Sequence, residues 1–484
     1  MKILLINPPT SFEQIYGDWD LGELDTYSPP LGILHIAGYI REHHHQVHIL
    51  DLQCKTWDLD MIIRHTLSAK PDIIGLSAMT INCINANKIA TGLKNGGLQA
   101  PIVLGGAHIS AVPVETLERF EGIDYGVVGE GEITFLELIE RIRSNQSVED
   151  VKGVAWRNKK GQIIINEPRD LIENLDSLPL PAWDLLENFP KSYPSSLLES
   201  KRLPSTAIMT SRGCPFSCTF CDHRVFGSQV RHNSANYAMN MIRHLKNEYG
   251  IRDLMILDDN FLINKQKLFD ISNAMIAERL DLTWYCLGHV RSMTMETLAK
   301  IKEAGCWFVE VGVESGNDQI LKHIKKNANK ARIREAIKNA KTAGLKTKGN
   351  FIFGFPGETE ETLEETIKFA LELDLDFFQQ NFLTIWPGCE LSAEISNSRA
   401  EFYKPDWGKL AHQRITFVPL GMTQQGLIRA SKKAFRKFYL RPRILLGLLP
   451  QLASLRGIKL SLTASYVFLK TIFRKSEVHW VTKD

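Results

Sequence analysis

Three cysteines crowd into eight positions near the middle of the chain. Cys214, Cys218 and Cys221 stand in C-x3-C-x2-C spacing, directly after a strand predicted over Ala207 to Thr210. A structural zinc site closes with four ligands, usually as two C-x2-C pairs, and no fourth Cys or His follows at matching spacing. His223 lies too near Cys221 in the chain to join the same site. Three thiolates suit a 4Fe-4S cluster with one iron open to a substrate or cofactor.

The residues around and after the triad alternate between strand and helix signals. Such alternation is typical of parallel βα units, which close into a partial (β/α)6 TIM-like barrel with its functional residues at the carboxyl ends of the strands. The six strands are predicted over Ala207 to Thr210, Asp253 to Leu257, Thr283 to Leu287, Phe308 to Val313, Gly349 to Phe353 and Asn381 to Trp386.

Polar or glycine-containing segments follow three of these strands. Asp258-Asp259-Asn260 ends the second strand, Glu314-Ser315-Gly316 ends the fourth, and a segment from Gly354 to Glu358 follows the fifth. Taken singly, the acidic residues are compatible with helix caps and first helical turns. Their joint placement at successive strand ends, counted from the triad, favours a cofactor site.

The cysteine spacing, with the aromatic Phe220 before the last cysteine, resembles the radical SAM signature, and the likeness runs from about Thr206 to Pro387. The resemblance implies that the open iron binds S-adenosylmethionine. It also implies that an electron, supplied by an external donor such as flavodoxin or ferredoxin, cleaves this cofactor to a 5′-deoxyadenosyl radical. The S-adenosylmethionine contacts that it implies are Phe220, Asp258, Asp259, Asn260, Glu314, Ser315, Gly354, Gly357 and Glu358.

The first 145 residues also alternate strands and helices, which predicts a doubly wound, Rossmann-like parallel sheet that binds its ligand at the carboxyl ends of the strands. The strands are predicted over Lys2 to Asn7, Val47 to Asp51, Asp72 to Thr80, Pro101 to Gly106 and Tyr125 to Gly129. The helices are predicted over Leu31 to Glu42, Leu59 to Ser68, Ile84 to Leu93 and Ile133 to Ile142. A dinucleotide is not favoured, because the G-x-G-x-x-G spacing after the first strand is missing.

Small residues gather at this predicted edge. The glycines at 105, 106, 129 and 131 have no Cβ, so the backbone can approach a large flat or phosphorylated ligand closely, and Ser77 and Thr80 offer hydroxyls. Any one glycine pair alone is compatible with a tight βα turn. Several such loops at one edge favour a ligand site.

A doubly wound domain ahead of such a barrel resembles the cobalamin-binding radical SAM family, also called class B methylases. The likeness includes Pro29-Pro30-Leu31-Gly32 and Leu178-Pro-x-Pro-Ala182, whereas the D-x-H-x-x-G motif that supplies an axial His elsewhere is absent. The resemblance implies methylation of an unactivated carbon of a small-molecule or lipid substrate. The cobalamin contacts that it implies are Ser77, Thr80, Gly105, Gly106, His108, Gly129, Glu130 and Gly131.

Two other functions stay open from the sequence. One is a cobalamin-associated radical cyclisation, rearrangement or oxidation without methyl transfer. The other is a redox-responsive or cobalamin-responsive binding module with a structural cluster. Cys389, just after the sixth predicted strand, is a candidate catalytic residue that faces substrate, although a buried free cysteine is the commoner case.

The domains are predicted as residues 1–145 (cobalamin-binding-like), 146–199 (a hairpin around Lys159 to Gly161 and a Pro-rich linker), 200–425 (barrel) and 426–484 (helical extension). Eight Cys in 484 residues are too few for a disulfide scaffold, and the sequence shows neither a signal peptide nor a spanning segment, so we expect a cytoplasmic protein.

The net charge of +3 hides a separation, because residues 407–476 contain 14 basic and no acidic side chains, against 44 basic and 55 acidic in the rest. Arg429 to Tyr439 is predicted as a basic helix, followed by mostly apolar stretches over Ile444 to Leu455 and Leu460 to Phe473. These helices either contact an anionic membrane surface peripherally or pack against the acidic body. Nucleic acid is not an expected partner.

Overall fold

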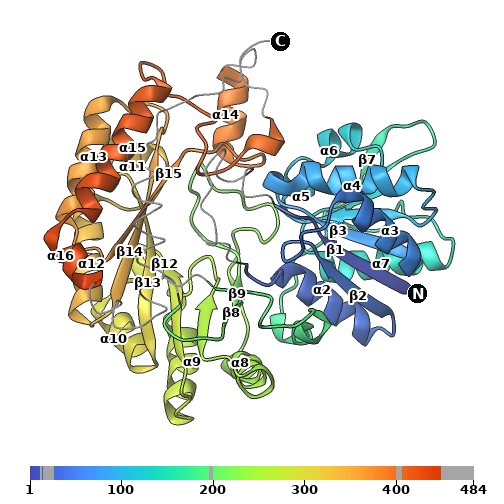
Figure 1. The fold of residues 1–484 in the computed structure, drawn as a ribbon, viewed down its shortest axis with the longest axis horizontal. Coiled ribbons are helices and arrows are strands. Elements are labelled where there is room, and N and C mark those ends of the chain that lie inside the picture. The colour runs from blue at the N-terminus through green and yellow to red at the C-terminus, as the bar shows by residue number, and fades with distance from the viewer. Residues whose placement is uncertain (11–13, 15–26, 196–199, 399–405, 449–484) are drawn as a thin grey trace.

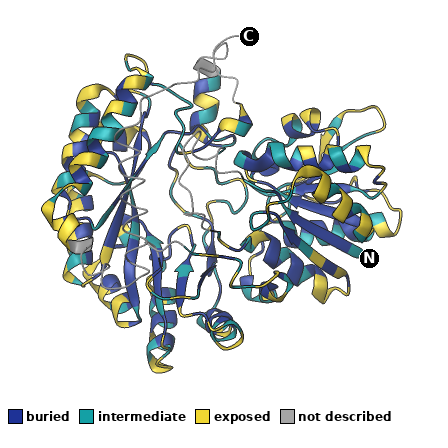
Figure 2. Cartoon of the chain, in the orientation of Figure 1, coloured by how far each residue is buried: buried dark blue, intermediate teal, exposed yellow. Residues whose placement is uncertain are grey.

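Two parallel sheets organise the molecule, one in each half of the chain (Figure 1). The computed structural model describes residues 1–484 apart from 11–13, 15–26, 196–199, 399–405 and 449–484. In Figure 1 the N-terminal sheet lies on the right and the C-terminal sheet on the left, and the loops after β8 run between them. Buried residues line both sheets, as Figure 2 shows.

The N-terminal sheet has seven strands in the order β2-β1-β3-β4-β5-β6-β7. Its parallel strands are β1 (Lys2–Asn7), β2 (Gln46–Asp51), β3 (Ile73–Ser77), β4 (Ile102–Gly105) and β5 (Tyr125–Val127). The helices between and after them are α2 (Leu31–Glu42), α3 (Leu59–Ala69), α4 (Cys83–Asn95), α5 (Ala107–Ala111), α6 (Pro113–Arg119) and α7 (Gly131–Arg143). The doubly wound sheet predicted from the sequence is thereby confirmed.

Alternation along β1 explains why both faces of this sheet are covered. Successive side chains of a strand point to opposite faces. Ile3 and Leu5 join the core that α2 and α7 cover, whereas Leu4 and Ile6 join the core that α3 and α4 cover. An apolar run without polar interruption is therefore what a strand buried on both faces requires.

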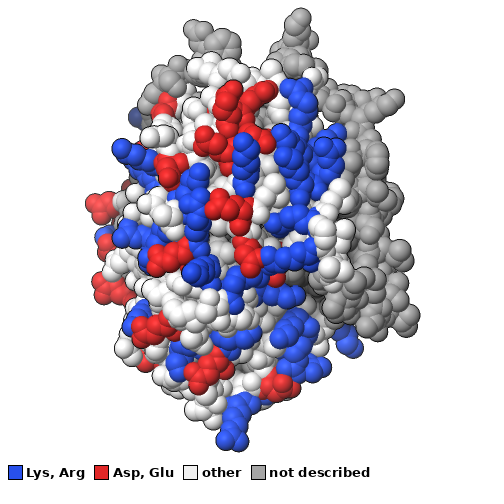
Figure 3. Space-filling view, turned by 90° about the vertical axis from the view of Figure 1, so that its left-hand side faces the viewer, with Lys and Arg blue, Asp and Glu red and all other residues white. Residues whose placement is uncertain are grey.

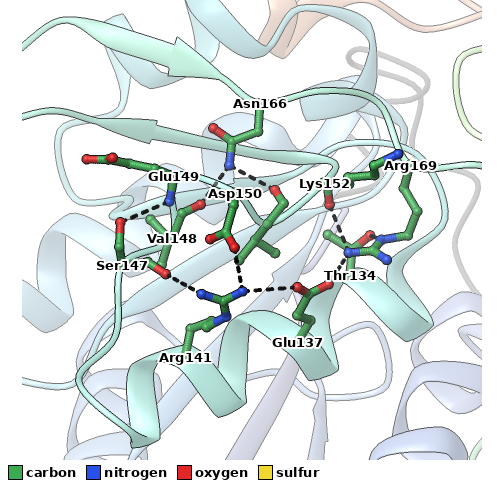
Figure 4. A network of polar contacts seen from close by, with 11 residues as sticks. Thr134, Glu137, Arg141, Ser147, Val148, Glu149, Asp150, Lys152, Asn166 and Arg169 are labelled. Carbon is green, nitrogen blue, oxygen red and sulfur yellow. Dashed lines mark hydrogen bonds and ion pairs between the residues drawn. The ribbon is translucent and has the colours of Figure 1, made fainter.

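The hairpin that the sequence places in the connecting segment extends the N-terminal sheet. Its strands β6 (Val154–Arg157) and β7 (Ile163–Ile165) are antiparallel, and β6 pairs with β5. Figure 4 shows the polar contacts that tie this segment to α7: Arg141 bonds Asp150, and Arg169 bonds Glu137. The sequence predicts the hairpin turn. No local pattern, however, indicates which strand of the sheet the hairpin will pair with.

The C-terminal sheet is an open barrel of six parallel strands in the order β15-β14-β13-β12-β11-β8, as predicted. The strands are β8 (Ser205–Ile208), β11 (Asp253–Ile256), β12 (Thr283–Gly288), β13 (Cys306–Glu314), β14 (Lys346–Phe353) and β15 (Phe377–Phe382). The covering helices are α8 (Ala235–Tyr249), α9 (Lys265–Ala277), α10 (Met295–Glu303), α11 (Asp318–His323), α12 (Lys330–Thr342) and α13 (Glu360–Glu372). A two-stranded ladder of β9 (Ser211–Arg212) and β10 (Arg231–His232) brackets the cysteine loop.

The predicted position of the sixth strand is wrong by four residues, because the strand spans Phe377–Phe382 rather than Asn381 to Trp386. Gln379 and Gln380 make this segment look unlike a buried strand. Gln380 is nevertheless buried, since its side chain accepts a hydrogen bond from Ser431 of a C-terminal helix. A partner so distant in the chain is not visible in a local pattern.

The basic helix predicted over Arg429 to Tyr439 is α15 (Gln424–Tyr439), and it packs against the barrel. Its Phe438 ring stacks on Phe378 of β15, and Lys433 pairs with Glu364 of α13. On this outer wall Lys and Arg are interspersed with Asp and Glu (Figure 3). Of the two arrangements expected for the basic helix, membrane contact or packing against the acidic body, α15 shows the packing.

The two apolar stretches predicted beyond α15 lie largely outside the described residues. The first begins as α16 (Pro442–Leu448), whereas all of Leu460 to Phe473 lies outside. Within the described ranges, no helix combines the length and the apolar character that crossing a bilayer requires. Before α15, the chain forms α14 (Glu390–Ser398) and a short turn, Trp407–Lys409, whose Trp407 packs into the core of the N-terminal half.

Candidate functional site

The cysteine loop starts from a buried anchor. Asp258, at the end of β11, accepts hydrogen bonds from the backbone N–H and the hydroxyl of Thr210 and from the backbone N–H of Ser211. Burial raises the pKa of Asp258 to about 6. Gly213 comes next with φ +91°, and a Cβ there would lie 2.4 Å from the carbonyl oxygen of Gln229. Asp258, predicted as a cofactor contact, therefore positions the start of the loop.

The three cysteines lie along this loop at different depths. Cys214 is half-buried, Cys218 is buried and Cys221 is exposed. The pKa of Cys218 is lowered to about 7, first because its sulfur accepts a hydrogen bond from the Cys221 thiol, and further by the positive charge of Lys326. A thiol with such a pKa supplies the thiolate that a metal site needs.

The donor set fits a cluster better than a single ion. Among the residues that the structure describes, no three His, Cys, Asp or Glu side chains converge as ligands of one metal ion. Each of three cysteines that bind a 4Fe-4S cluster binds a different iron, so the sulfurs need not meet at one point. The Phe220 ring packs against Phe355, with centroids 5.5 Å apart, and so holds the loop against the turn after β14.

A buried ion pair lies beside the cysteines. Glu314, at the end of β13, has a φ of +65°, and its carboxylate binds Lys326 Nζ at 2.7 Å. A Cβ on Gly312 would lie 2.2 Å from Glu314 Oε1 and 2.7 Å from Lys326 Nζ, so a larger residue there would displace this ion pair. Lys326 is not predictable as a site residue from the sequence, because it stands in a lysine-rich turn without a motif.

The other residues predicted to contact S-adenosylmethionine also lie at strand ends. Ser315 is buried, and its hydroxyl contacts Thr366 of α13. Asn260 is buried and accepts from the His289 N–H, which leaves its Nδ2 without a partner. Asp259 beside it is exposed. These residues surround the mouth of the barrel at the side where the cysteine loop lies.

The side chain of Glu358 folds back onto the backbone of the turn that follows β14. Its Oε2 accepts from the backbone N–H groups of Gly354 and Phe355, and its Oε1 is buried without a partner. Burial raises the pKa of Glu358 to about 8, which favours the protonated form of the carboxyl group near neutral pH. Gly354 and Gly357 both have positive φ angles, which this tight turn requires.

A cavity opens between the carboxyl edge of the N-terminal sheet and the cysteine loop. Of the eight predicted cobalamin contacts, six line it: Ser77, Gly105, Gly106, Gly129, Glu130 and Gly131. The facing wall comes from the other half of the chain and consists of Met209, Arg212, Val225 and Phe226. This wall, which the sequence analysis missed, flanks the cysteine loop on both sides.

Glycines leave room for a large ligand in this cavity. A Cβ on Gly32 or Gly129 would have no atom within 4 Å, and the nearest to one on Gly105 would be 3.9 Å away. All three line the cavity, so side chains at these positions would enter it. Ile33 and Phe135 contribute apolar surface. The glycines and apolar residues of this lining would allow the face of a large, flat group such as cobalamin to lie against the edge of the sheet.

Thr80 and His108, the other two predicted contacts, do not line the cavity. The Thr80 hydroxyl lies 3.1 Å from His108 Nδ1, and the His108 ring packs edge-on against Trp407 with centroids 4.4 Å apart. Burial lowers the pKa of His108 to about 3, so the imidazole is neutral. This pair joins the N-terminal half to the segment that returns from the barrel.

A buried charge network crosses the cavity wall. Arg212 binds Glu130 at 2.7 Å and Glu132 at 2.5 Å, and Arg231 binds the second oxygen of Glu130 at 2.7 Å. These four side chains are between 3% and 5% exposed. Glu130, predicted as a cobalamin contact, thus lines the cavity. Both of its carboxylate oxygens form ion pairs that join the two halves of the chain.

Cys389 lies where three segments meet. It is buried, and burial raises the pKa of its thiol. A Cβ on the preceding Gly388 would lie 2.9 Å from Ala111 of α5 and 2.9 Å from Asp222 of the cysteine loop. The Cys389 turn therefore packs between the N-terminal half and the cysteine loop.

Two family models match this chain. The radical SAM superfamily matches residues 208–370, and the B12 binding domain matches residues 20–139. An uncharacterized methyltransferase, PH0819, of Pyrococcus horikoshii is 34% identical over 92% of this chain and 94% of its own length. An anaerobic magnesium-protoporphyrin IX monomethyl ester cyclase of Rubrivivax gelatinosus is 25% identical over 92% of this chain and 78% of its own.

The solved structure of OxsB, a cobalamin-dependent S-adenosylmethionine radical enzyme, shares this fold. It superimposes with a TM-score of 0.73 at 18% identity, covering 98% of this chain and 73% of that one. The fold and the site define an iron–sulfur enzyme with a second cofactor domain. The chain belongs to the B12-binding radical SAM methylase family, whose cofactors are a 4Fe-4S cluster, S-adenosylmethionine and cobalamin.

Filling the cavity from its glycine wall should abolish cobalamin binding. Gly129→Leu places a side chain in the cavity, whereas Gly161→Leu is a matched control, because both glycines have similar φ angles (+84° and +79°) and open space around Cβ. We expect spectroscopic titration with hydroxocobalamin to show at least about a tenfold loss for Gly129→Leu alone, since backbone strain is common to both. Equal affinities of the two variants would contradict the assignment of the cavity.

Removing one partner of the charge network should cost far more than removing a surface charge. Glu130→Ala leaves Arg231 and part of Arg212 buried without a counterion, which we expect to cost about 3–5 kcal/mol. Glu278→Ala breaks an exposed pair with Arg243 and should cost about 0.2–1 kcal/mol. Chemical unfolding of both variants measures the difference, and similar costs would show that the network does not hold the two halves together.

Proposed function

We propose that this protein methylates an unactivated carbon of a small-molecule or lipid substrate. The observation that carries the proposal is that one loop serves two sites. It holds the three cysteines, and its flanks, Arg212 on one side and Val225 and Phe226 on the other, form a wall of the glycine-lined cavity. A methyl donor and a radical generator must lie close together, because a carbon radical exposed to solvent is lost to side reactions.

In this proposal each cofactor is bound by its own set of residues. Cys214, Cys218 and Cys221 hold the cluster. Phe220, Asp259, Asn260, Glu314, Ser315 and the turn from Gly354 to Glu358 surround S-adenosylmethionine, and Asp258 anchors the loop start. Ser77, Gly105, Gly106, Gly129, Glu130 and Gly131 face cobalamin, while Thr80 and His108 support that edge from behind. When bound, the cluster supplies the electron that cleaves S-adenosylmethionine, and cobalamin supplies a transferable methyl group.

The chain's own side chains prepare this space for radical chemistry. Met209, Val225 and Phe226 give the cavity an apolar wall, which disfavours water between the two sites. The ion pairs of Arg212 with Glu130 and Glu132 close the wall. Lys326 places a positive charge beside Cys218 and Cys221, which partly offsets the negative charge of the thiolates. Cys389 is retained as a candidate catalytic residue at the edge of the loop.

A second candidate function keeps the radical step and omits methyl transfer. The relative from Rubrivivax gelatinosus, which matches 92% of this chain, is named a cyclase. A cyclisation, rearrangement or oxidation of substrate is therefore the alternative. Incubation with S-adenosylmethionine labelled in its methyl group and host extract, followed by mass spectrometry, separates the two: methylation transfers the label to a product, whereas the alternative leaves products unlabelled.

Partners and location follow from the same proposal. The reducing electron comes from an external donor of the flavodoxin or ferredoxin type. A cytoplasmic enzyme with peripheral membrane contact is the arrangement that we propose for a lipid substrate. The contact that we propose is made through the C-terminal extension, residues 426–484.

Replacing a cluster ligand tests the radical step directly. Cys218→Ala should abolish reductive cleavage of S-adenosylmethionine and lower the iron content, because only two ligands remain for the cluster. Cys286→Ala, which changes a buried cysteine of β12 outside the triad, is the control and should retain both. The measurement is 5′-deoxyadenosine formed by anaerobically reconstituted protein. Unchanged cleavage by Cys218→Ala would contradict the proposed function.

A further inference from the structure

A second cavity lies on another side of the cysteine loop. Residues 215–217, which join Cys214 to Cys218, form part of its wall. Four basic side chains line the rest together with neutral residues: Arg291, Lys322, Lys325 and Arg332. Neither Asp nor Glu lines this cavity. Its lining therefore differs in charge from the mixed outer wall of the barrel.

Two of the four cations keep an uncompensated charge. Lys325 pairs with Glu390, and Arg332 pairs with Glu335, at partly exposed positions where such pairs contribute little. The Arg291 guanidinium donates to the neutral side chain of Asn327, and Lys322 is exposed. Among the described residues, neither Arg291 nor Lys322 forms an ion pair. The cavity therefore presents positive charge to an incoming partner.

The same cavity reaches the segment that joins two of the cluster ligands. Pro215 and Ser217 are exposed, and the Phe216 ring between them stacks on His289 with centroids 3.9 Å apart. A group docked here would lie against the short segment that joins two cluster ligands. In the proposed function, the electron for the cluster comes from an external donor.

We propose that this basic cavity docks an acidic one-electron donor protein, of the flavin or iron–sulfur type, whose surface carboxylates bind Arg291 and Lys322. Opposite surface charge steers such an encounter and orients it. The step transfers one electron. The donor is oxidised by one electron, and the cluster is reduced by one electron. This inference rests on the proposed function and names the surface through which its reductant acts.

The test compares two reductants on the same protein. The double variant Arg291→Glu, Lys322→Glu is assayed for 5′-deoxyadenosine, once with reduced flavodoxin and its reductase and once with dithionite. We expect at least about a tenfold slower reaction with flavodoxin, because the charges that steer docking are reversed, and an unchanged rate with dithionite, which is small and needs no docking surface. The flavodoxin-driven rate of the unmodified protein should also fall as salt is added.

Lys159→Glu, Lys160→Glu is the matched control, since it reverses two exposed charges in the hairpin turn of the N-terminal half. It should leave both rates unchanged. Equal losses with both reductants in the Arg291, Lys322 variant would overturn the proposal and indicate that the cavity binds an anionic substrate instead. An unchanged flavodoxin-driven rate would overturn it as well. Absence of dithionite-driven cleavage in the unmodified protein would instead refute the proposed function.

Discussion

The buried charges of Arg212, Arg231, Glu130 and Glu132 are the contact on which the arrangement of the two sites depends. Taking such charges out of water costs several kcal/mol for each ion, and only close partners offset that cost. Both arginines flank the cysteine loop, and the two carboxylates come from the N-cap (Glu130) and the first turn (Glu132) of α7 at the edge of the N-terminal sheet. The charges are compensated only when the loop and the edge face one another.

This constraint gives the cysteine loop its two roles. One side of the loop carries the cluster ligands at the mouth of the barrel, while its flanks complete a cavity whose opposite wall consists of glycines and apolar side chains. Other long-range contacts support the same arrangement, since Trp407 returns from the barrel to pack on His108. A rigid, water-poor space between two cofactors is what a reaction between a substrate radical and a methyl donor requires.

Local sequence patterns predict the scaffold well, because its elements are specified by their own residues. The strand β1 and the helix α2, for example, have the predicted bounds, Lys2–Asn7 and Leu31–Glu42. They also predict the cysteine triad and most of the glycine wall. What they miss depends on partners far apart in the chain. The buried Gln380 side chain is paired with Ser431, and the Glu130 carboxylate is paired with Arg212 and Arg231, so neither role can be read from the residues next to them in the chain.

The central claim is that one chain holds a cluster and cobalamin on facing walls of the same site. Pulsed EPR of anaerobically reconstituted protein, with the cluster reduced and the cobalamin in its paramagnetic Co(II) state, tests it most directly. Facing sites predict that the two electron spins interact, so that the cobalamin relaxes faster when the cluster is reduced than when it is oxidised. Two independent spectra, with cobalamin relaxation that does not respond to the cluster, would contradict the account.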